Sequence, residues 1–349
     1  MKAKEKKRLL GNVVFLIIVL IVIYLIIFSF HDIKDVFQII KTIKIKYLYY
    51  LFGIVLLHLF VVAMAIAVIS TGISSNVKFL DSLNIANTEH LFNAITPFAS
   101  GGQPIHGYYF MKYGIPAEKT VSILVSNFLV YQATAALFSI VGLSLYLGKI
   151  IALIKGQVIL ILIGFSINIL ILVSIILLST VPKSAKLYRF VIRGLGKIKP
   201  LKNVMIKAEE KLFEFVKDFQ ASMKALFKRK RVFLGSVSLR LLDIFVLNST
   251  AVVIFLALGV PLSSSDYFFI IVMSLFAQTF LMWIPTPGAA GAVEWAFTIL
   301  FVGILDISLI VPSLLLWRFF TYYFPLIMGF ISYLVVRKRS VIYENSFTD

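Results

Sequence analysis

Long runs of apolar residues recur from one end of the chain to the other, separated by shorter polar segments. A run of about 20 apolar residues is long enough for a helix to cross a hydrocarbon layer of roughly 30 Å. The runs lack the alternation of a barrel strand, and a helix satisfies its own backbone hydrogen bonds where no water is present. The pattern predicts membrane-spanning helices at residues 9–30, 47–71, 120–147, 157–181, 232–258, 267–284, 291–305 and 313–336.

Two segments interrupt this pattern at what would be membrane depth. Residues 83–116 mix polar and apolar positions, and residues 284–291 read Ile-Pro-Thr-Pro-Gly-Ala-Ala-Gly. Proline and glycine open the helical hydrogen-bond ladder, and open backbone survives in a bilayer only inside protein or beside a water-filled cavity. We therefore expect two re-entrant or broken helices. Both contain Thr-Pro followed by small residues, about 190 residues apart, and matching breaks in two halves point to a transport site at the repeat interface.

The predicted fold class is an all-α integral membrane protein with about eight transmembrane helices in two halves. Residues 1–182 form the first half, with a re-entrant segment at 83–116. Residues 183–231 form a basic linker, and residues 232–349 form the second half, with a Pro-Gly broken helix at 284–294.

Composition agrees with this reading, because 60% of the 349 residues are apolar and 14% are charged, against about 25% charged in soluble domains. The basic residues are unevenly distributed between the two sides of the predicted topology. Residues 2–8, the linker and residues 337–339 together hold 23 lysines and arginines, whereas the opposite side holds six. The positive-inside rule then predicts a multi-pass protein of the cytoplasmic membrane with both termini cytosolic.

The linker has a pattern of its own. Between Val204 and Phe227 apolar residues recur at roughly helical spacing, and lysines occupy many of the other positions. This predicts an amphipathic helix over residues 203–231 that lies on anionic inner-leaflet lipids. A solvated cytosolic hairpin is the alternative. The net charge of +18 is assigned to orientation and lipid contact, and no nucleic-acid partner is expected, because no binding motif accompanies the charge.

Ionisable side chains inside spans are costly and are therefore candidates for function. Arg240 and Asp243 lie three residues apart on one helix face, and Arg240 is near enough to the cytosolic end for its charge to reach the interface. Glu294 follows the Pro-Gly break, and Arg318 lies one turn before Tyr322. Each could instead belong to an ion pair that only stabilises packing. The first half contributes His58, Glu89, His90 and His106, with His58 expected to be packed or interfacial.

Enzymatic chemistry has little support. The sequence has no phosphate-binding Gly-rich loop with a lysine, no nucleophile elbow and no large segment outside the predicted membrane spans. It has no cysteine, and its His and Glu residues lack metal-ligand spacing, since the adjacent Glu89 and His90 would face different directions. We expect neither an enzyme nor a cofactor.

The broken segments also carry a family resemblance. Residues 284–294 resemble the Pro-x-Pro-Gly-Gly-x-Gly-x-x-Glu signature of the lysylphosphatidylglycerol synthase transmembrane (flippase-like) family, with Ala289 in place of its second glycine. Residues 96–106 are similar to the first-half motif, although Gln103 and His106 replace the Glu and Arg that are frequent there, and residues 317–329 are similar to the last helix. The likeness extends over nearly the whole chain.

The resemblance implies a module that translocates lipids with modified headgroups, without the aminoacyl-transferase domain of longer members. The expected substrate is an anionic phospholipid such as aminoacylated phosphatidylglycerol, or a polyprenyl-phosphate conjugate. A non-transporting scaffold and a small-solute or ion transporter remain alternatives, and an oligomer is compatible with each. The candidate substrate-binding residues are Glu89, Pro97, Gly101, Gly102, Gln103, His106, Arg240, Asp243, Pro287, Gly288, Gly291, Glu294, Arg318 and Tyr322.

Overall fold

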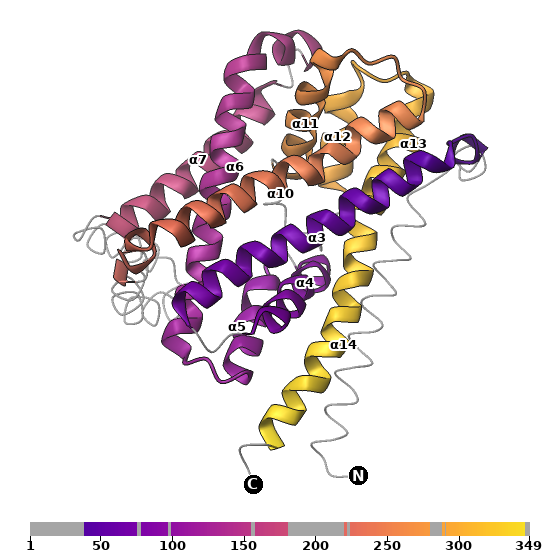
Figure 1. The fold of residues 1–349 in the computed structure, drawn as a ribbon. Coiled ribbons are helices and arrows are strands. Elements are labelled where there is room, and N and C mark those ends of the chain that lie inside the picture. Colours follow the sequence, from indigo (N-terminus) through magenta and orange to yellow (C-terminus); the bar gives the residue numbers. More distant parts are fainter. Residues whose placement is uncertain are drawn as a thin grey trace, which may run out of the picture.

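A computed structural model describes residues 38–74, 78–96, 99–154, 158–180, 220–221, 224–279, 288–289 and 291–345. The regular elements within these ranges are helices (Figure 1). They are α3 (Ile45–Ile73), α4 (Phe79–Ile95), α5 (Gly102–Lys112), α6 (Ala117–Ile154), α7 (Val158–Thr180), α10 (Lys230–Ala257), α11 (Ser264–Thr279), α12 (Ala292–Phe301), α13 (Ile307–Arg318), the π-helical turn η3 (Phe319–Tyr323) and α14 (Phe324–Asn345). The predicted span 9–30, most of the linker, Pro97 and Pro287 lie outside the described residues.

Among the described residues, four helical stretches are long and apolar enough to cross a membrane. They are α3, α6, α10 and the continuous stretch Ile307–Lys338. These match the spans predicted at 47–71, 120–147, 232–258 and 313–336, although the last helical stretch begins six residues earlier than its predicted span. The all-helical membrane fold is thereby confirmed.

Helices α3 and α10 cross the middle of the bundle side by side and run in opposite directions (Figure 1). Gly72 near the end of α3 lies against Val232 near the start of α10. Further along both helices, His58 meets Asp243. A Cβ atom on Gly72 would lie 2.8 Å from the Val232 side chain, so a glycine is needed for this close approach.

The first broken segment is a helical hairpin made of α4 and α5. It opens at the end of the bundle where α3 terminates, because Ser70 of α3 contacts Ser82 of α4 at 2.9 Å between hydroxyl oxygens. At its tip, the Gly101 amide donates to Thr96 Oγ1 at 2.8 Å, and the Gly102 amide donates to Asn93 Oδ1 at 2.7 Å. Side-chain oxygens thus satisfy the amides that a helix N-terminus leaves free.

The second broken segment is a hairpin made of α11 and α12, which opens at the opposite end of the bundle. Asp266 at the start of α11 pairs with Lys149 at the end of α6, and Phe301 at the end of α12 packs edge-to-face against Phe255 at the end of α10. The spans predicted at 267–284 and 291–305 are therefore the two arms of one hairpin. With 16 and 10 residues, both arms are shorter than the about 20 residues that a crossing needs.

The two halves form an inverted repeat. Helices α3 and α10 begin at Ile45 and Lys230, and α4 and α11 begin at Phe79 and Ser264, so both pairs are offset by 185 residues. Helices α6 and α13 begin 190 residues apart. Because α3 and α10 are antiparallel, each repeat is inverted relative to the other, and the two hairpins enter the bundle from opposite ends. This is the arrangement of many secondary transporters.

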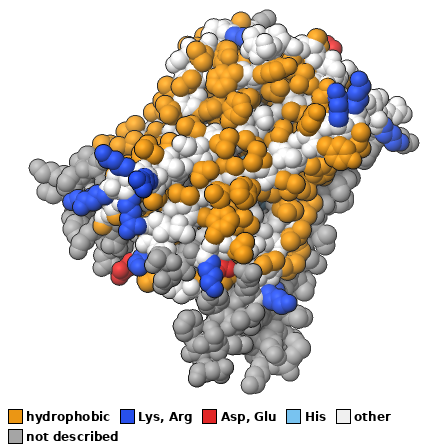
Figure 2. All heavy atoms as spheres, in the orientation of Figure 1, with side chains coloured by type: hydrophobic (Ala, Val, Ile, Leu, Met, Phe, Trp, Pro, Cys, Tyr) orange, Lys and Arg blue, Asp and Glu red, His pale blue; other side chains and the backbone are white. Residues whose placement is uncertain are grey.

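The outer surface of the bundle matches a lipid environment. Figure 2 shows hydrophobic side chains in a broad area over the helices, with Lys and Arg gathered toward its margins. Large apolar side chains are exposed along the predicted spans, among them Leu145, Leu170 and Leu234. In water such an area would be unfavourable, whereas in a bilayer it faces hydrocarbon.

Candidate functional site

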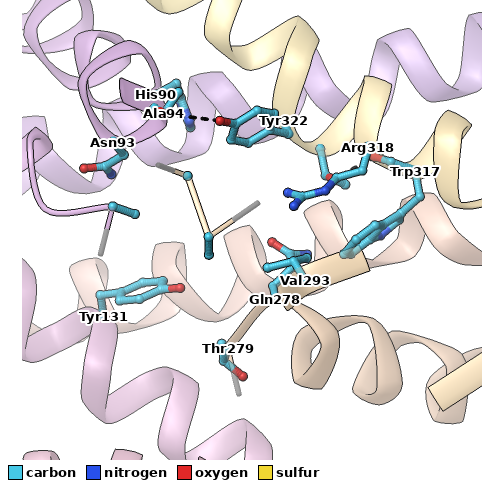
Figure 3. Close-up of a pocket in the computed structure, with 14 residues that line it drawn as sticks. His90, Asn93, Ala94, Tyr131, Gln278, Thr279, Val293, Trp317, Arg318 and Tyr322 are labelled. Atoms are coloured by element: carbon cyan, nitrogen blue, oxygen red, sulfur yellow. Dashed lines mark hydrogen bonds between the residues drawn. The ribbon is translucent and has the colours of Figure 1, made fainter. Parts of the chain in front are cut away.

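A cavity of about 190 Å³, lined by both polar and apolar groups, lies where the two hairpin tips approach each other. Both repeats contribute to its wall (Figure 3). The lining residues are His90, Asn93, Ala94, Ala99, Tyr131, Gln278, Thr279, Gly288, Ala289, Val293, Trp317, Arg318, Thr321 and Tyr322. Irregular backbone at membrane depth is thus beside a cavity, where the sequence predicted it.

Arg318 supplies the positive charge of this cavity. Its guanidinium points into the space from α13, and Tyr131 reaches in from α6 on the other side (Figure 3). Arg318 is 5% exposed and pairs with Glu294, donating from Nε to Oε1 at 2.7 Å. Glu294 Oε2 accepts from the Gly291 amide at 2.7 Å. One carboxylate therefore caps the N-terminus of α12 and fixes the guanidinium, which is a favourable place for a negative charge.

Backbone irregularities surround Arg318. Immediately after it, five residues form the π-helical turn η3, a feature that often accompanies functional sites. Tyr322 in this turn lies with its ring 5.0 Å from the Arg318 guanidinium and donates a hydrogen bond to the Ala94 carbonyl at 3.3 Å. Gly288 has φ 58° and faces Tyr322 so closely that a Cβ atom there would overlap the phenol ring. Glycine is required at this position for both reasons.

A second polar cluster lies deeper, at the crossing of α3 and α10. His58 Nδ1 and Asp243 Oδ1 are 2.6 Å apart. Arg240 donates to Asp243 Oδ2 at 3.2 Å and to Asn127 Oδ1 of α6 at 2.7 Å. His58, Asp243, Arg240 and Asn127 are each 4% exposed. Tyr131 connects the cluster to the cavity, because its ring lies 5.6 Å from the Arg240 guanidinium.

The remaining predicted residues occupy the first hairpin. Glu89 and His106 approach each other at 3.9 Å. Gly102 allows α5 to approach α4, because a Cβ atom there would lie 2.5 Å from the Glu89 side chain. Gln103 and His106 belong to α5, and neither they nor Glu89 lines the cavity described above. The prediction that Glu89 and His90 face apart is confirmed, since His90 lies beside His58 and the cavity.

The prediction for the Arg240 charge is wrong. Arg240 does not extend its charge to the interface, because Asp243 and Asn127 hold its guanidinium inside the protein. His58 is packed, as predicted, but sequence reasoning missed its contact with Asp243 and also missed Asn93, Tyr131 and Gln278. The repeat offset could have identified two of these residues from the sequence. Asn93 and Gln278 are 185 residues apart, at equivalent positions of α4 and α11, and both line the cavity.

Comparison with protein families identifies the family of this chain. Residues 12–329 match the family described as lysylphosphatidylglycerol synthase TM region. The chain belongs to this family. The match includes both hairpins, the cavity and Arg318, so the whole candidate site lies within the shared region. A search among curated proteins found no match for this chain. Membership in this family supports a multi-pass protein embedded in a membrane, and the family description relates the family to phosphatidylglycerol metabolism.

Within this family module, the cavity has the chemistry of an anion site. It combines a guanidinium with amide and phenol groups, and these are the groups that bind phosphate oxygens in proteins. The described residues contain no cluster of three or more His, Asp or Glu side chains that could hold a metal ion. Glu294 already pairs with the Arg318 guanidinium, and the remaining donor groups in the cavity wall are of the kind that can contact an anion.

Proposed function

We propose that this protein translocates an anionic lipid across the cytoplasmic membrane. The substrate is a phospholipid with a modified headgroup, such as aminoacylated phosphatidylglycerol, or a polyprenyl-phosphate conjugate. The observation that carries the proposal is the position of Arg318. Its guanidinium points into a cavity bounded by both hairpin tips.

The size of the cavity supports a headgroup rather than a whole lipid. At about 190 Å³ it is smaller than the roughly 300–1,000 Å³ of ordinary ligand pockets. In our proposal Arg318 binds the phosphate, while Asn93, Gln278 and Tyr322 contact the polar substituents. The acyl or prenyl chains stay in the surrounding lipid, so only the headgroup crosses through protein.

The inverted repeat supports alternating access. Two hairpins that enter from opposite ends give each aqueous phase its own gate to a fixed central site, and small rigid-body movements of one repeat against the other open the gates in turn. We assign both termini to the cytosol and the basic linker to the anionic inner leaflet. We propose transport without catalysis for this module.

A double-variant comparison tests the role of Arg318. Arg318→Gln, Glu294→Gln and the double variant are reconstituted in vesicles with NBD-labelled phosphatidylglycerol, and movement between leaflets is followed by dithionite quenching. Thermal unfolding is measured on the same samples. Lys149→Gln, which removes a surface ion pair with Asp266, is the matched control.

If Arg318 binds substrate, Arg318→Gln folds but does not move the probe, and adding Glu294→Gln does not restore movement. If the pair only stabilises packing, Glu294→Gln loses about 3–5 kcal/mol because the buried Arg318 charge is left uncompensated. Arg318→Gln loses less, because the Glu294 side chain is 25% exposed, and the double variant recovers. Recovery of lipid movement in the double variant would contradict the proposal and favour a scaffold.

A further inference from the structure

The buried cluster at the α3–α10 crossing is continuous with the cavity. His90 lines the cavity, and its ring centroid lies 5.6 Å from that of His58. His58 contacts Asp243, which pairs with Arg240. The chain of polar groups therefore runs from the headgroup site into the centre of the inverted repeat, and none of the roles proposed above uses it.

The charges of this cluster balance without any added proton. Asp243 carries one negative charge and Arg240 one positive charge, and a neutral His58 completes this balance when its Nδ1 hydrogen faces the carboxylate. Each neutral imidazole ring then has one nitrogen that can take up a proton. His58 Nε2 has a lone pair in this tautomer, and His90 Nε2 is buried without a hydrogen-bond partner among the described residues. A buried polar atom without a partner is costly, and it commonly marks a functional role.

We propose that His58 and His90 form a proton-binding site that couples headgroup movement to proton uptake. The inference rests on the proposed function. One proton from the aqueous phase adds to the Nε2 lone pair of either ring, and no other bond changes. The rings are close enough that two positive charges would repel, so the pair holds one proton at a time.

Charged and titratable groups surround the pair on every packed element. Asp243 on α10 and Glu89 on α4 favour the protonated form. Arg240 on α10 and Arg318 on α13 oppose it, and Glu294 on α12, which pairs with Arg318, offsets part of that opposition. A charged His106 on α5 also opposes it, while Tyr131 and Tyr322 stay neutral. The proton adds positive charge beside the Arg318–Glu294 pair, and an anion that enters the cavity compensates that charge.

These charges couple proton binding to headgroup binding. A phosphate headgroup beside Arg318 supplies the negative charge that a proton on His90 or His58 requires, so each ligand raises the affinity for the other by the same factor. If one proton is taken up with the headgroup, the affinity for the headgroup rises by up to about tenfold for each pH unit of acidification. Intramembrane histidine and carboxylate chains serve as proton relays in transporters.

Proton uptake on binding is the direct test. Dihexanoyl phosphatidylglycerol is added to the purified full-length protein in weakly buffered detergent, with a pH indicator to count protons and calorimetry to measure binding. The variants are His58→Asn and His90→Gln. Asparagine keeps an N–H donor where His58 Nδ1 faces Asp243 and removes the titratable nitrogen. The control is Asp266→Asn, a carboxyl far from the cavity.

We expect the wild type and Asp266→Asn to take up close to one proton per headgroup bound, and each histidine variant to bind with proton uptake reduced at least about threefold. Binding by the wild type without proton uptake overturns the coupling and leaves the proposed function intact. No binding by the wild type, together with no movement of the NBD probe, overturns both. The wild-type measurement by itself decides whether proton uptake accompanies binding. The test therefore still stands if one of the variants fails to fold.

Discussion

His58 and Asp243 occupy equivalent positions in the two inverted repeats and meet at the crossing of α3 and α10. They are 185 residues apart in the chain, and their side-chain atoms approach to 2.6 Å. The same offset relates the first residues of α3 and α10. The contact therefore joins the two repeats near their common centre, where a polar group is shielded from lipid by both halves.

The buried pair of Arg240 and Asp243 should be strongly coupled. Replacing Asp243 by Asn or Arg240 by Gln leaves one charge uncompensated in the interior, and we expect a loss of about 3–5 kcal/mol of stability for each single change. The double variant should recover most of this loss. Tryptophan fluorescence during thermal unfolding in detergent measures it. Single variants as stable as the wild type would contradict the assignment of a charged pair.

Gly329 should be essential for the packing of α14 on α4. A Cβ atom there would lie 2.8 Å from the Asn87 carbonyl oxygen and 2.9 Å from the Leu91 nitrogen, both backbone atoms that cannot rotate away. We expect Gly329→Ala to cost about 1–3 kcal/mol. Gly148 in α6 is the matched control, since nothing lies within 4 Å of its added Cβ. There the same change should stabilise the helix by about 0.5–1 kcal/mol.

The ion pair of Lys149 and Asp266, at the open end of the second hairpin, should make the stability of the protein depend on pH in the acid range. Hydrogen bonds from Lys149 and Ser263 lower the pKa of the Asp266 carboxyl to about 2. A carboxyl whose pKa is lowered by folding contributes stability above its unfolded pKa of about 3.9, and loses it as the pH falls toward 2. Asp266→Asn should therefore lower the unfolding temperature slightly at pH 7 and not at pH 2. Equal shifts at both values would disprove the ionic contribution.

The predicted orientation can be checked by cysteine labelling, because the chain contains no cysteine. We expect Lys202→Cys and Ser346→Cys to react with a membrane-impermeant maleimide only after cells are permeabilised. Ser264→Cys, at the mouth of the second hairpin, should react in intact cells, because the positive-inside rule assigns the opposite end to the cytosol. Labelling of Lys202→Cys or Ser346→Cys in intact cells would contradict the predicted topology.

Much of the architecture follows from the sequence alone. A helix in lipid satisfies its own backbone, so long apolar runs such as those in α3 and α10 predict helices without knowledge of any partner. Proline and glycine act through local backbone geometry, and they marked both hairpin tips. The pairing of Arg240 with Asp243 was also accessible, because their spacing of three residues places them on one face of a helix.

Only the tertiary structure decided which groups from different helices meet. His58 and Asp243 are brought together by the crossing of two helices, and the partner of a side chain across such a crossing leaves no local pattern in the sequence. Arg240 turned inward because Asn127 of α6 completes its hydrogen bonds, although its distance from the helix end alone favoured the interface. The length of an apolar run likewise could not distinguish a crossing helix from a hairpin arm, because that depends on where the chain turns back.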